Sequence, residues 1–131
     1  MTPEESLERV LRAAGLEGGH WPYTRSADVF AGWRPAEDSV PERPSGRRVR
    51  IRVTYDIVLC HRRGAQKKAE AARFALYRAL ETAGWTLCDT GPEVYTAQTE
   101  MFYWPVTAAR GFGLDADGQP YDLTDRGDAH E

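Results

Sequence analysis

The residues best suited to chemistry in this sequence are its three histidines and two cysteines. His20, His61 and His130 stand in three polar stretches and form no helix-spaced pair, so we expect each of them to be solvated. Cys60 and Cys88 lie far apart and lack metal-ligand spacing. This pattern predicts two free, buried thiols in a reducing cytosol and no metal site.

The adjacent pair Cys60-His61 has the composition of a thiol beside its base. Neighbouring residues of a strand point to opposite faces, so these two side chains cannot meet directly. A nucleophile and its base meet in space rather than in sequence, and a third group that would orient the base is missing. We therefore expect no catalysis at this pair.

Two glycine-containing motifs resemble ligand sites only in part. Asp115-Ala116-Asp117-Gly118 begins like a calcium loop, but Gln-Pro-Tyr follows and no helix comes after it, which favours a simple turn. Gly111-Phe112-Gly113 lacks the third glycine and the helix of a phosphate-binding loop. The carboxylates are scattered, with no pair placed for acid–base work. The sequence thus predicts no catalytic, metal-binding or cofactor-binding residues, and a protein that is not an enzyme.

The clearest concentration of charge is basic, although the 131-residue chain has a net charge of −3 at pH 7. That balance does not favour a nucleic-acid duplex as the main partner. The cluster is interpreted either as a solvated edge strand, where charge deters edge pairing, or as a contact with a protein or nucleic-acid partner. Its members are Arg43, Arg47, Arg48, Arg50, Arg52, Arg62, Arg63, Lys67 and Lys68.

Aromatic residues gather in a second place, near Tyr95 and from Met101 to Trp104. Met101 and Tyr103 alternate with Phe102 and Trp104, so both faces of a strand would carry bulk. One face can belong to the core, and the other is exposed unless something covers it, which indicates an oligomer interface. The candidate interface residues from both clusters are Arg48, Arg50, Arg52, Arg62, Arg63, Phe102 and Trp104.

Capping and alternation predict the main elements that position these residues. Thr2-Pro3-Glu4-Glu5 forms a capping box and starts a helix over Pro3 to Ala14, which Gly15 ends. Apolar residues alternate from Arg48 to Cys60, which predicts the clearest strand. A second helix is expected over about 65–83.

Weaker signals complete the expected order. The second helix should end at Gly84, with Trp85 in the apolar position of a Schellman motif. The other expected strands are 27–33, 85–88, 93–103, which Pro105 closes, and a further strand over 108–114.

These elements predict an α+β fold, with a mostly antiparallel sheet of about four to five strands and two helices packed on one face. We expect a single domain over 1–131, with a mobile loop at about 34–47 and a frayed tail at about 122–131. The acidic, polar start is unlike a signal peptide, and no apolar run approaches the roughly 20 residues that a membrane span needs.

The layout resembles a known family in architecture and hydrophobic pattern over about residues 5–105. The segments that carry the resemblance are Leu-Arg-Ala-Ala-Gly-Leu at 11–16, Val-Arg-Ile-Arg-Val-Thr-Tyr-Asp-Ile-Val-Leu at 49–59, Ala-Glu-Ala-Ala-Arg-Phe-Ala-Leu-Tyr-Arg-Ala-Leu at 69–80, Gly84-Trp85, and the strand pair around 94–104. In these features the chain is similar to the tail terminator (tail completion) proteins of long-tailed bacteriophages, including prophage members described as minor capsid proteins. The 34–47 segment and the part after residue 106 are not clearly matched.

The resemblance implies a ring, typically of six subunits, at the head-proximal end of a phage tail tube. Such a ring stops tube growth and presents a surface to head-completion proteins, while DNA passes through its centre without sequence-specific binding. It also implies a protein of the virion, present in the host cytoplasm during assembly, without catalysis or cofactors.

Two other classes stay open, namely another head–tail connector or tube protein, and a small non-catalytic binding module. Because an arginine-lined lumen would tend to hold DNA, we expect the arginines at a protein interface instead.

Overall fold

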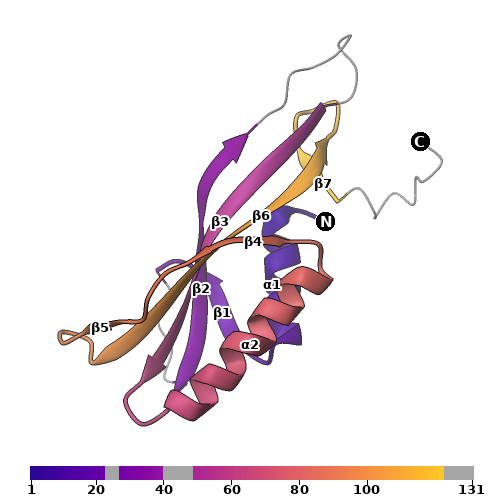
Figure 1. Cartoon of the computed structure of the whole chain (residues 1–131). Helices are drawn as coiled ribbons and strands as arrows, with labels where there is room; N and C mark the ends of the chain where they lie inside the picture. The colour runs from indigo at the N-terminus through magenta and orange to yellow at the C-terminus, as the bar shows by residue number, and fades with distance from the viewer. Residues whose placement is uncertain (23–26, 40–48, 123–131) are drawn as a thin grey trace.

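The computed structural model of the chain describes residues 1–22, 27–39 and 49–122, which form an α+β fold with two helices and one seven-stranded sheet. The elements are α1 (Pro3–Ala13), β1 (Glu17–His20), β2 (Val29–Ser39), β3 (Val49–Arg62), α2 (Gln66–Thr82), β4 (Thr86–Thr90), β5 (Val94–Thr96), β6 (Met101–Leu114) and β7 (Pro120–Tyr121). The main path of the sheet is β1-β2-β3-β6-β4, and β5 and β7 pair with the two ends of β6. Both helices lie on one side of the sheet, as expected (Figure 1).

The sheet is larger than expected, and it is mixed rather than only antiparallel. β1 runs parallel to β2, whereas every other pairing is antiparallel among the described strands. β1 was not predicted, because paired glycines such as Gly18-Gly19 usually interrupt regular structure. A Cβ atom at Gly18 would lie 2.2 Å from Leu11 Cδ1 and 2.6 Å from the Ala31 carbonyl oxygen. Glycine therefore permits the close approach of this strand to α1 and β2.

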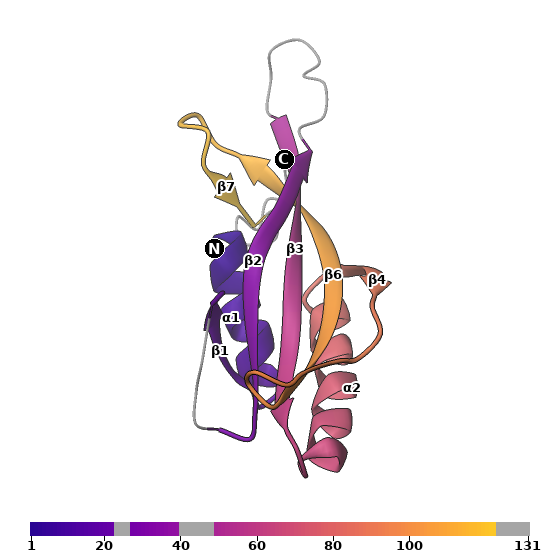
Figure 2. The same ribbon diagram turned by 90° about the vertical axis from the view of Figure 1, so that its left-hand side faces the viewer.

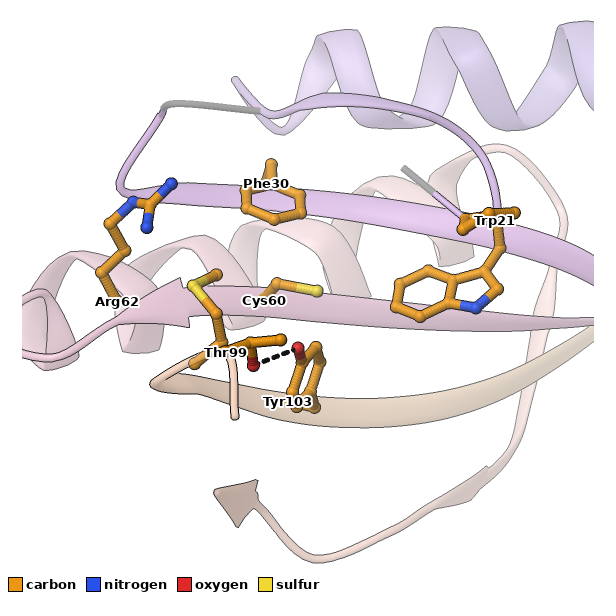
Figure 3. Close-up of a pocket in the computed structure, with 8 residues that line it drawn as sticks. Trp21, Phe30, Cys60, Arg62, Thr99 and Tyr103 are labelled. Atoms are coloured by element: carbon orange, nitrogen blue, oxygen red, sulfur yellow. Dashed lines mark hydrogen bonds between the residues drawn. The ribbon is translucent and has the colours of Figure 1, made fainter. Parts of the chain in front are cut away.

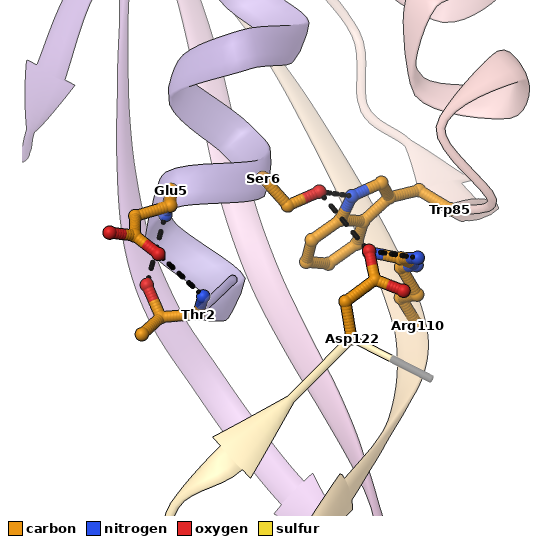
Figure 4. Close-up of polar contacts among 6 residues, drawn as sticks. All are labelled: Thr2, Glu5, Ser6, Trp85, Arg110 and Asp122. Atoms are coloured by element: carbon orange, nitrogen blue, oxygen red, sulfur yellow. Dashed lines mark hydrogen bonds and ion pairs between the residues drawn. The ribbon is translucent and has the colours of Figure 1, made fainter. Parts of the chain in front are cut away.

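Helix α1 begins and ends as its sequence predicts. The Glu5 N–H donates to Thr2 Oγ1 at 3.2 Å, and the Thr2 N–H donates to the Glu5 carboxylate at 2.8 Å (Figure 4). The bond from the Thr2 backbone is the main reason that the pKa of Glu5 is lowered. At the other end Gly15 adopts φ +75°, and the Leu16 N–H donates to the Leu11 carbonyl at 2.9 Å. These contacts satisfy the terminal backbone groups that a helix leaves unpaired.

Helix α2 ends in the same Schellman arrangement, as predicted. Gly84 adopts φ +90° and donates its N–H to the Glu81 carbonyl, while the Trp85 N–H donates to the Leu80 carbonyl at 2.9 Å. The Trp85 side chain then turns into the core, where it is 2% exposed. Its indole N–H donates to Ser6 Oγ of α1 at 3.0 Å, so the cap of one helix is joined to the other helix (Figure 4).

The central strand β3 supplies much of the core. Its alternate residues Val53, Tyr55, Ile57 and Leu59 are buried in the main cluster with residues of both helices. Burial, with smaller effects from Glu4 and Asp38, raises the pKa of Tyr55 to about 12. The opposite face of the sheet carries a smaller cluster, in which Phe30, Cys60 and Met101 are buried.

The expected loop over 34–47 is wrong in its first part. Residues 34–39 continue β2 and pair with β3, and residues 40–47 lie outside the described part. Pro35 suggested a break, but β1 pairs with β2 only as far as Trp33, and the β2–β3 register shifts between Pro35 and Glu37. A proline is tolerated on such an edge beside a bulge, because no ladder partner needs its missing N–H.

The expected strand over 93–103 is also wrong, because a turn divides it into β5 and the start of β6. Glu100 adopts φ +57° in this turn and donates its N–H to the Thr96 carbonyl at 2.8 Å. Pro105 does not close the strand, and β6 continues to Leu114 as one element that includes the separate strand expected over 108–114. The Pro105 carbonyl accepts from the Gly91 N–H at 3.0 Å. The backbone of Pro105 thus faces the edge between β5 and β4, and its missing N–H removes no bond to β3.

Asp122, the first residue of the tail that was expected to fray over about 122–131, is held in the fold. Asp122 is buried, and its carboxylate accepts from Arg110 of β6 at 2.8 Å (Figure 4). Arg110 also donates to Ser6 Oγ at 3.3 Å, so β6, α1 and the segment after β7 share one polar network. Residues 123–131 lie outside the described part. The Asp115 turn is as predicted, since its carboxylate accepts from the N–H groups of Asp117 and Gln119.

Candidate assembly interface

The β5–β6 hairpin, residues 94–103, projects from the body as an arm on the side away from the helices (Figure 1). Figure 2, turned by 90°, shows the same hairpin in front of the sheet. Two of the three large hydrophobic residues that the described part leaves exposed belong to this arm, Val94 at 49% and Tyr95 at 39%. The third is Phe74 of α2, at 57%. Exposed apolar residues of this size are typical of contact surfaces.

An unbroken series of ring contacts joins the arm to α2. Tyr95 lies 4.7 Å from Phe102, Phe102 stacks on His61 at 4.8 Å with planes 6° apart, and His61 lies 5.5 Å from Trp104, all between ring centroids. Arg63 begins the series at the arm, because its guanidinium lies over the Tyr95 ring and donates to the Tyr95 hydroxyl at 3.2 Å. We call this series the aromatic ladder, and its members are Arg63, Tyr95, Phe102, His61, Trp104, Arg73, Phe74 and Tyr77.

Arg73 completes the ladder on the helix. Its guanidinium carbon lies 4.3 Å from the Trp104 ring centroid, 4.8 Å from that of Phe74 and 5.9 Å from that of Tyr77. Its Nε atom is buried and has no hydrogen-bond partner among the described residues. Cation–π contacts are therefore the main interaction of this side chain with its surroundings, each worth about 0.5–2 kcal/mol. Arg73 was not among the predicted interface residues, although its position next to Phe74 and four residues before Tyr77 places the three on one helix surface.

His61 holds the base of the arm. It was expected to be solvated in a turn, but β3 extends two residues beyond Cys60 and buries His61 completely. Nε2 lies 2.9 Å from the Glu93 carboxylate, and Nδ1 lies 3.1 Å from the Arg62 carbonyl. Glu93 directly precedes β5, so this contact joins the arm to the central strand. The alternation that buries Ile57 and Leu59 continues to His61 and was the signal for its burial.

The predicted aromatic interface residues lie on the helix side of the sheet. Phe102 and Trp104 are half-buried by the ladder and by the core, and the exposed rings are their neighbours Tyr95 and Phe74. Arg63 lies beside Tyr95. The structure thus brings these three predicted residues together, and their role at an interface stays a prediction.

The predicted arginines do not form one patch. Arg50 and Arg52 are exposed at the start of β3, whereas Arg62 and Arg63 stand at its end. Ten residues of extended strand separate Arg52 from Arg62, a distance of about 33 Å. Arg52 contacts Cys88 Sγ of β4 at 3.7 Å. Arg48 lies outside the described part.

A pocket of about 300 Å³ lies on the opposite face of the sheet (Figure 3). Trp21, Phe30, Cys60 and Tyr103 line it, and Arg62 is its charged member. Burial raises the pKa of the Cys60 thiol to about 12, which keeps it protonated at neutral pH. The pocket therefore offers an apolar recess rather than a nucleophile.

The cysteines, histidines and metal ligands considered from the sequence can now be placed. Cys60 is buried as expected, but Cys88 is exposed, because β4 lies at an edge of the sheet. His20 is exposed on β1, and His130 lies outside the described part. Within residues 1–22, 27–39 and 49–122, no three His, Cys, Asp or Glu side chains come together as metal ligands do. None of the described helices has the length and apolar character of a membrane span.

No protein-family model matches the chain, and no curated protein matches it either. A solved structure does match, a chain from a structure described as the virion of a native gene transfer agent particle. The two chains superpose with a TM-score of 0.61 and 16% sequence identity, over 84% of this chain and 94% of the other. The chain therefore shares its fold with that chain over most of its length.

Proposed function

We propose that this protein is a structural component of a phage-like virion and acts as a tail terminator. In this role, copies of the chain form a closed ring on the head-proximal end of the tail tube, stop its growth and join the tail to the head. The observation that carries the proposal is the fold, which the chain shares over 84% of its length with a chain of a gene transfer agent particle. The terminator role itself rests on the resemblance described above.

The distribution of exposed residues supports assembly with other copies. The arm presents Val94 and Tyr95 to solvent, and the ladder links them to the body through the buried His61, which also contacts the Glu93 carboxylate. A hairpin of two strands is marginally stable by itself. An arm that is anchored in this way and still exposes apolar side chains is suited to contact a neighbouring subunit.

The partners that follow are the chain itself, the tail tube and head-completion proteins, with DNA passing through the ring without sequence-specific contacts. The protein would then be found in the virion and, during assembly, in the host cytoplasm. Arg50 and Arg52, both exposed at one end of β3, are the candidate contacts with a head-side partner.

Particle assembly tests this proposal. In a phage or particle system that depends on this chain, replacing Arg50→Glu and Arg52→Glu should abolish the joining of tails to heads, while Lys67→Glu and Lys68→Glu, an equal change of charge at the exposed start of α2, should leave joining intact. Electron microscopy then counts free heads, free tails and complete particles. Unchanged joining in the arginine variant would contradict the assigned head-side surface.

Electron microscopy of the purified protein tests the role in the tail. A terminator forms closed rings, whereas a tube subunit polymerises into long tubes. Tubes would contradict the terminator role and favour a tube protein. Salt-dependent retention of DNA by single copies would favour a small binding module instead.

A further inference from the structure

The two helices leave a groove between them that no described element fills. Its volume is about 440 Å³, and its lining is mostly small and apolar. Small side chains allow close approach of another chain, because little bulk stands between the groove and the helix backbones. The lining residues are Arg9, Val10 and Ala13 of α1 and Ala75, Arg78, Ala79, Thr82 and Ala83, which lie on or directly after α2.

The charged residues of the groove are both basic. Arg9 and Arg78 lie on opposite sides of it, and neither forms an ion pair with a described residue. The groove is therefore suited to a segment that carries apolar side chains flanked by carboxylates.

The arm offers exposed apolar side chains and a carboxylate. The segment 93–100, Glu-Val-Tyr-Thr-Ala-Gln-Thr-Glu, contains no basic residue. Glu93, which precedes the arm, is paired with His61, so Glu100 is the carboxylate that can approach another copy. Val94 and Tyr95 are the exposed apolar side chains of the arm, and Glu100 is exposed in the turn. Glu100 adopts φ +57°, a conformation that is uncommon outside glycine, so the shape of this turn is held against a backbone preference.

The arm and the groove lie on opposite sides of the molecule. The arm projects from the side of the sheet away from α1 and α2, so it is directed away from the groove of its own chain (Figure 1). A contact between an arm and the groove of another copy joins two different surfaces. Contacts of this heterologous kind generate closed rings when the rotation between neighbours closes.

We propose that the arm of one copy inserts into the α1–α2 groove of the next copy. Val94 and Tyr95, which point to opposite faces of the hairpin, would lie against the two walls of the groove, and Glu100 would lie near Arg9 or Arg78. This inference rests on the proposed function, because it assigns the contact that would build the ring. It also explains why the arm keeps apolar residues exposed while His61 and Glu93 fix its base.

Disulfide trapping tests the contact directly. In a Cys88→Ser background, which removes the exposed native thiol, a Val94→Cys, Ala79→Cys variant carries one thiol on the arm and one in the groove. Diamide oxidises each thiol pair to a disulfide and takes up the two electrons and two protons. Non-reducing gels should then show a ladder of covalent oligomers up to the ring.

The control replaces Val94→Cys and Lys67→Cys, which places the second thiol on the exposed start of the same helix, outside the groove. It should give at least tenfold less cross-linking at equal concentration. A matched charge variant, Arg78→Glu, should shift the reduced protein from rings to single copies, while Lys67→Glu should leave the rings in place.

Light scattering of the reduced trapping variant separates the two proposals. Rings that cross-link no better through Ala79→Cys than through Lys67→Cys would overturn the arm-in-groove contact and leave the proposed function standing. A protein that remains as single copies at every concentration, without cross-linking, would overturn the arm-in-groove contact and would contradict a ring that forms by itself.

Discussion

The helix-packed body and the β5–β6 arm hold their aromatic residues in different ways. In the body Trp85 is 2% exposed, contacts Phe112 and Tyr55 edge to face and donates to Ser6. In the arm Tyr95 is 39% exposed and contacts Phe102 and Arg63. Burial of apolar surface stabilises the body, whereas the arm depends on ring contacts and one His–Glu pair.

This difference shows which part of the molecule is complete by itself. The body caps both ends of α1 and the C-terminal end of α2, and it buries most of its large side chains within one chain. The arm leaves apolar side chains in water, a state that a second surface would improve. Stability measurements should therefore respond to changes in the body, and assembly measurements to changes in the arm.

The largest effect is expected for Trp85→Ala. It removes a buried indole, leaves a cavity beside Phe112 and frees the Ser6 hydroxyl, so the free energy of unfolding should fall by about 3–5 kcal/mol. Urea denaturation followed by circular dichroism measures it. A loss below about 1 kcal/mol would contradict the assignment of this residue to the core.

Removal of the buried ion pair should follow closely. Asp122→Ala leaves the Arg110 guanidinium, whose side chain is 12% exposed, without its carboxylate. The expected cost is about 3 kcal/mol, because an uncompensated charge remains in the interior. Asp117→Ala, at an exposed turn position, is the matched control and should change stability by less than about 0.5 kcal/mol. If Asp122→Ala lowered the free energy of unfolding no more than Asp117→Ala does, the Arg110–Asp122 contact would add nothing to the stability of the fold.

Alkaline pH should weaken the body through Cys60 and Tyr55. Their pKa values are raised from 9.0 and 10.0 to about 12, so the unfolded chain loses these protons at lower pH than the folded chain. The stabilisation is fully present below about pH 9 and is lost as pH rises towards 12. Cys60→Val should make the free energy of unfolding fall less between pH 9 and 12, by up to about 4 kcal/mol, since one pKa unit corresponds to about 1.36 kcal/mol. Denaturation midpoints at several pH values measure the slope, and Cys88→Ser, at an exposed thiol, should leave it unchanged.

The smallest effect on stability is expected in the arm. Tyr95→Ser removes a ring that is 39% exposed, so the free energy of unfolding should fall by less than about 1 kcal/mol. The same variant should reduce assembly, as measured by sedimentation velocity. If Tyr95→Ser lowered the free energy of unfolding as much as Trp85→Ala, the arm would contribute to stability as the body does, and the distinction between them would fail.

The predictable part of the fold is the part governed by local rules. The Thr2 capping box, the ends at Gly15 and Gly84 and the alternation of β3 were predicted to within one or two residues, because each depends on neighbouring residues. The errors arose where tertiary pairing overrides a local signal. Pro105 was expected to close a strand and Pro35 lay in an expected loop, yet each occupies a sheet position that needs no N–H.

The candidate site was predictable in composition but not in arrangement. Phe102, Trp104 and Arg63 were identified from clustering, but the turn at Glu100 and the extension of β3 to Arg62 decide which rings are exposed. The role of His61 depends on Glu93, which is 32 residues away in the sequence. No periodic pattern reports a contact of this kind, so only the fold reveals it.

Light scattering of the purified wild-type protein across a concentration range tests the central claim most directly. Assembly into a closed ring predicts one discrete species that persists on dilution, with a mass of about 88 kDa for six copies of the 14.7 kDa chain. A strict monomer at all concentrations would contradict a ring that forms by itself, and a mass that rises without limit would contradict a closed one.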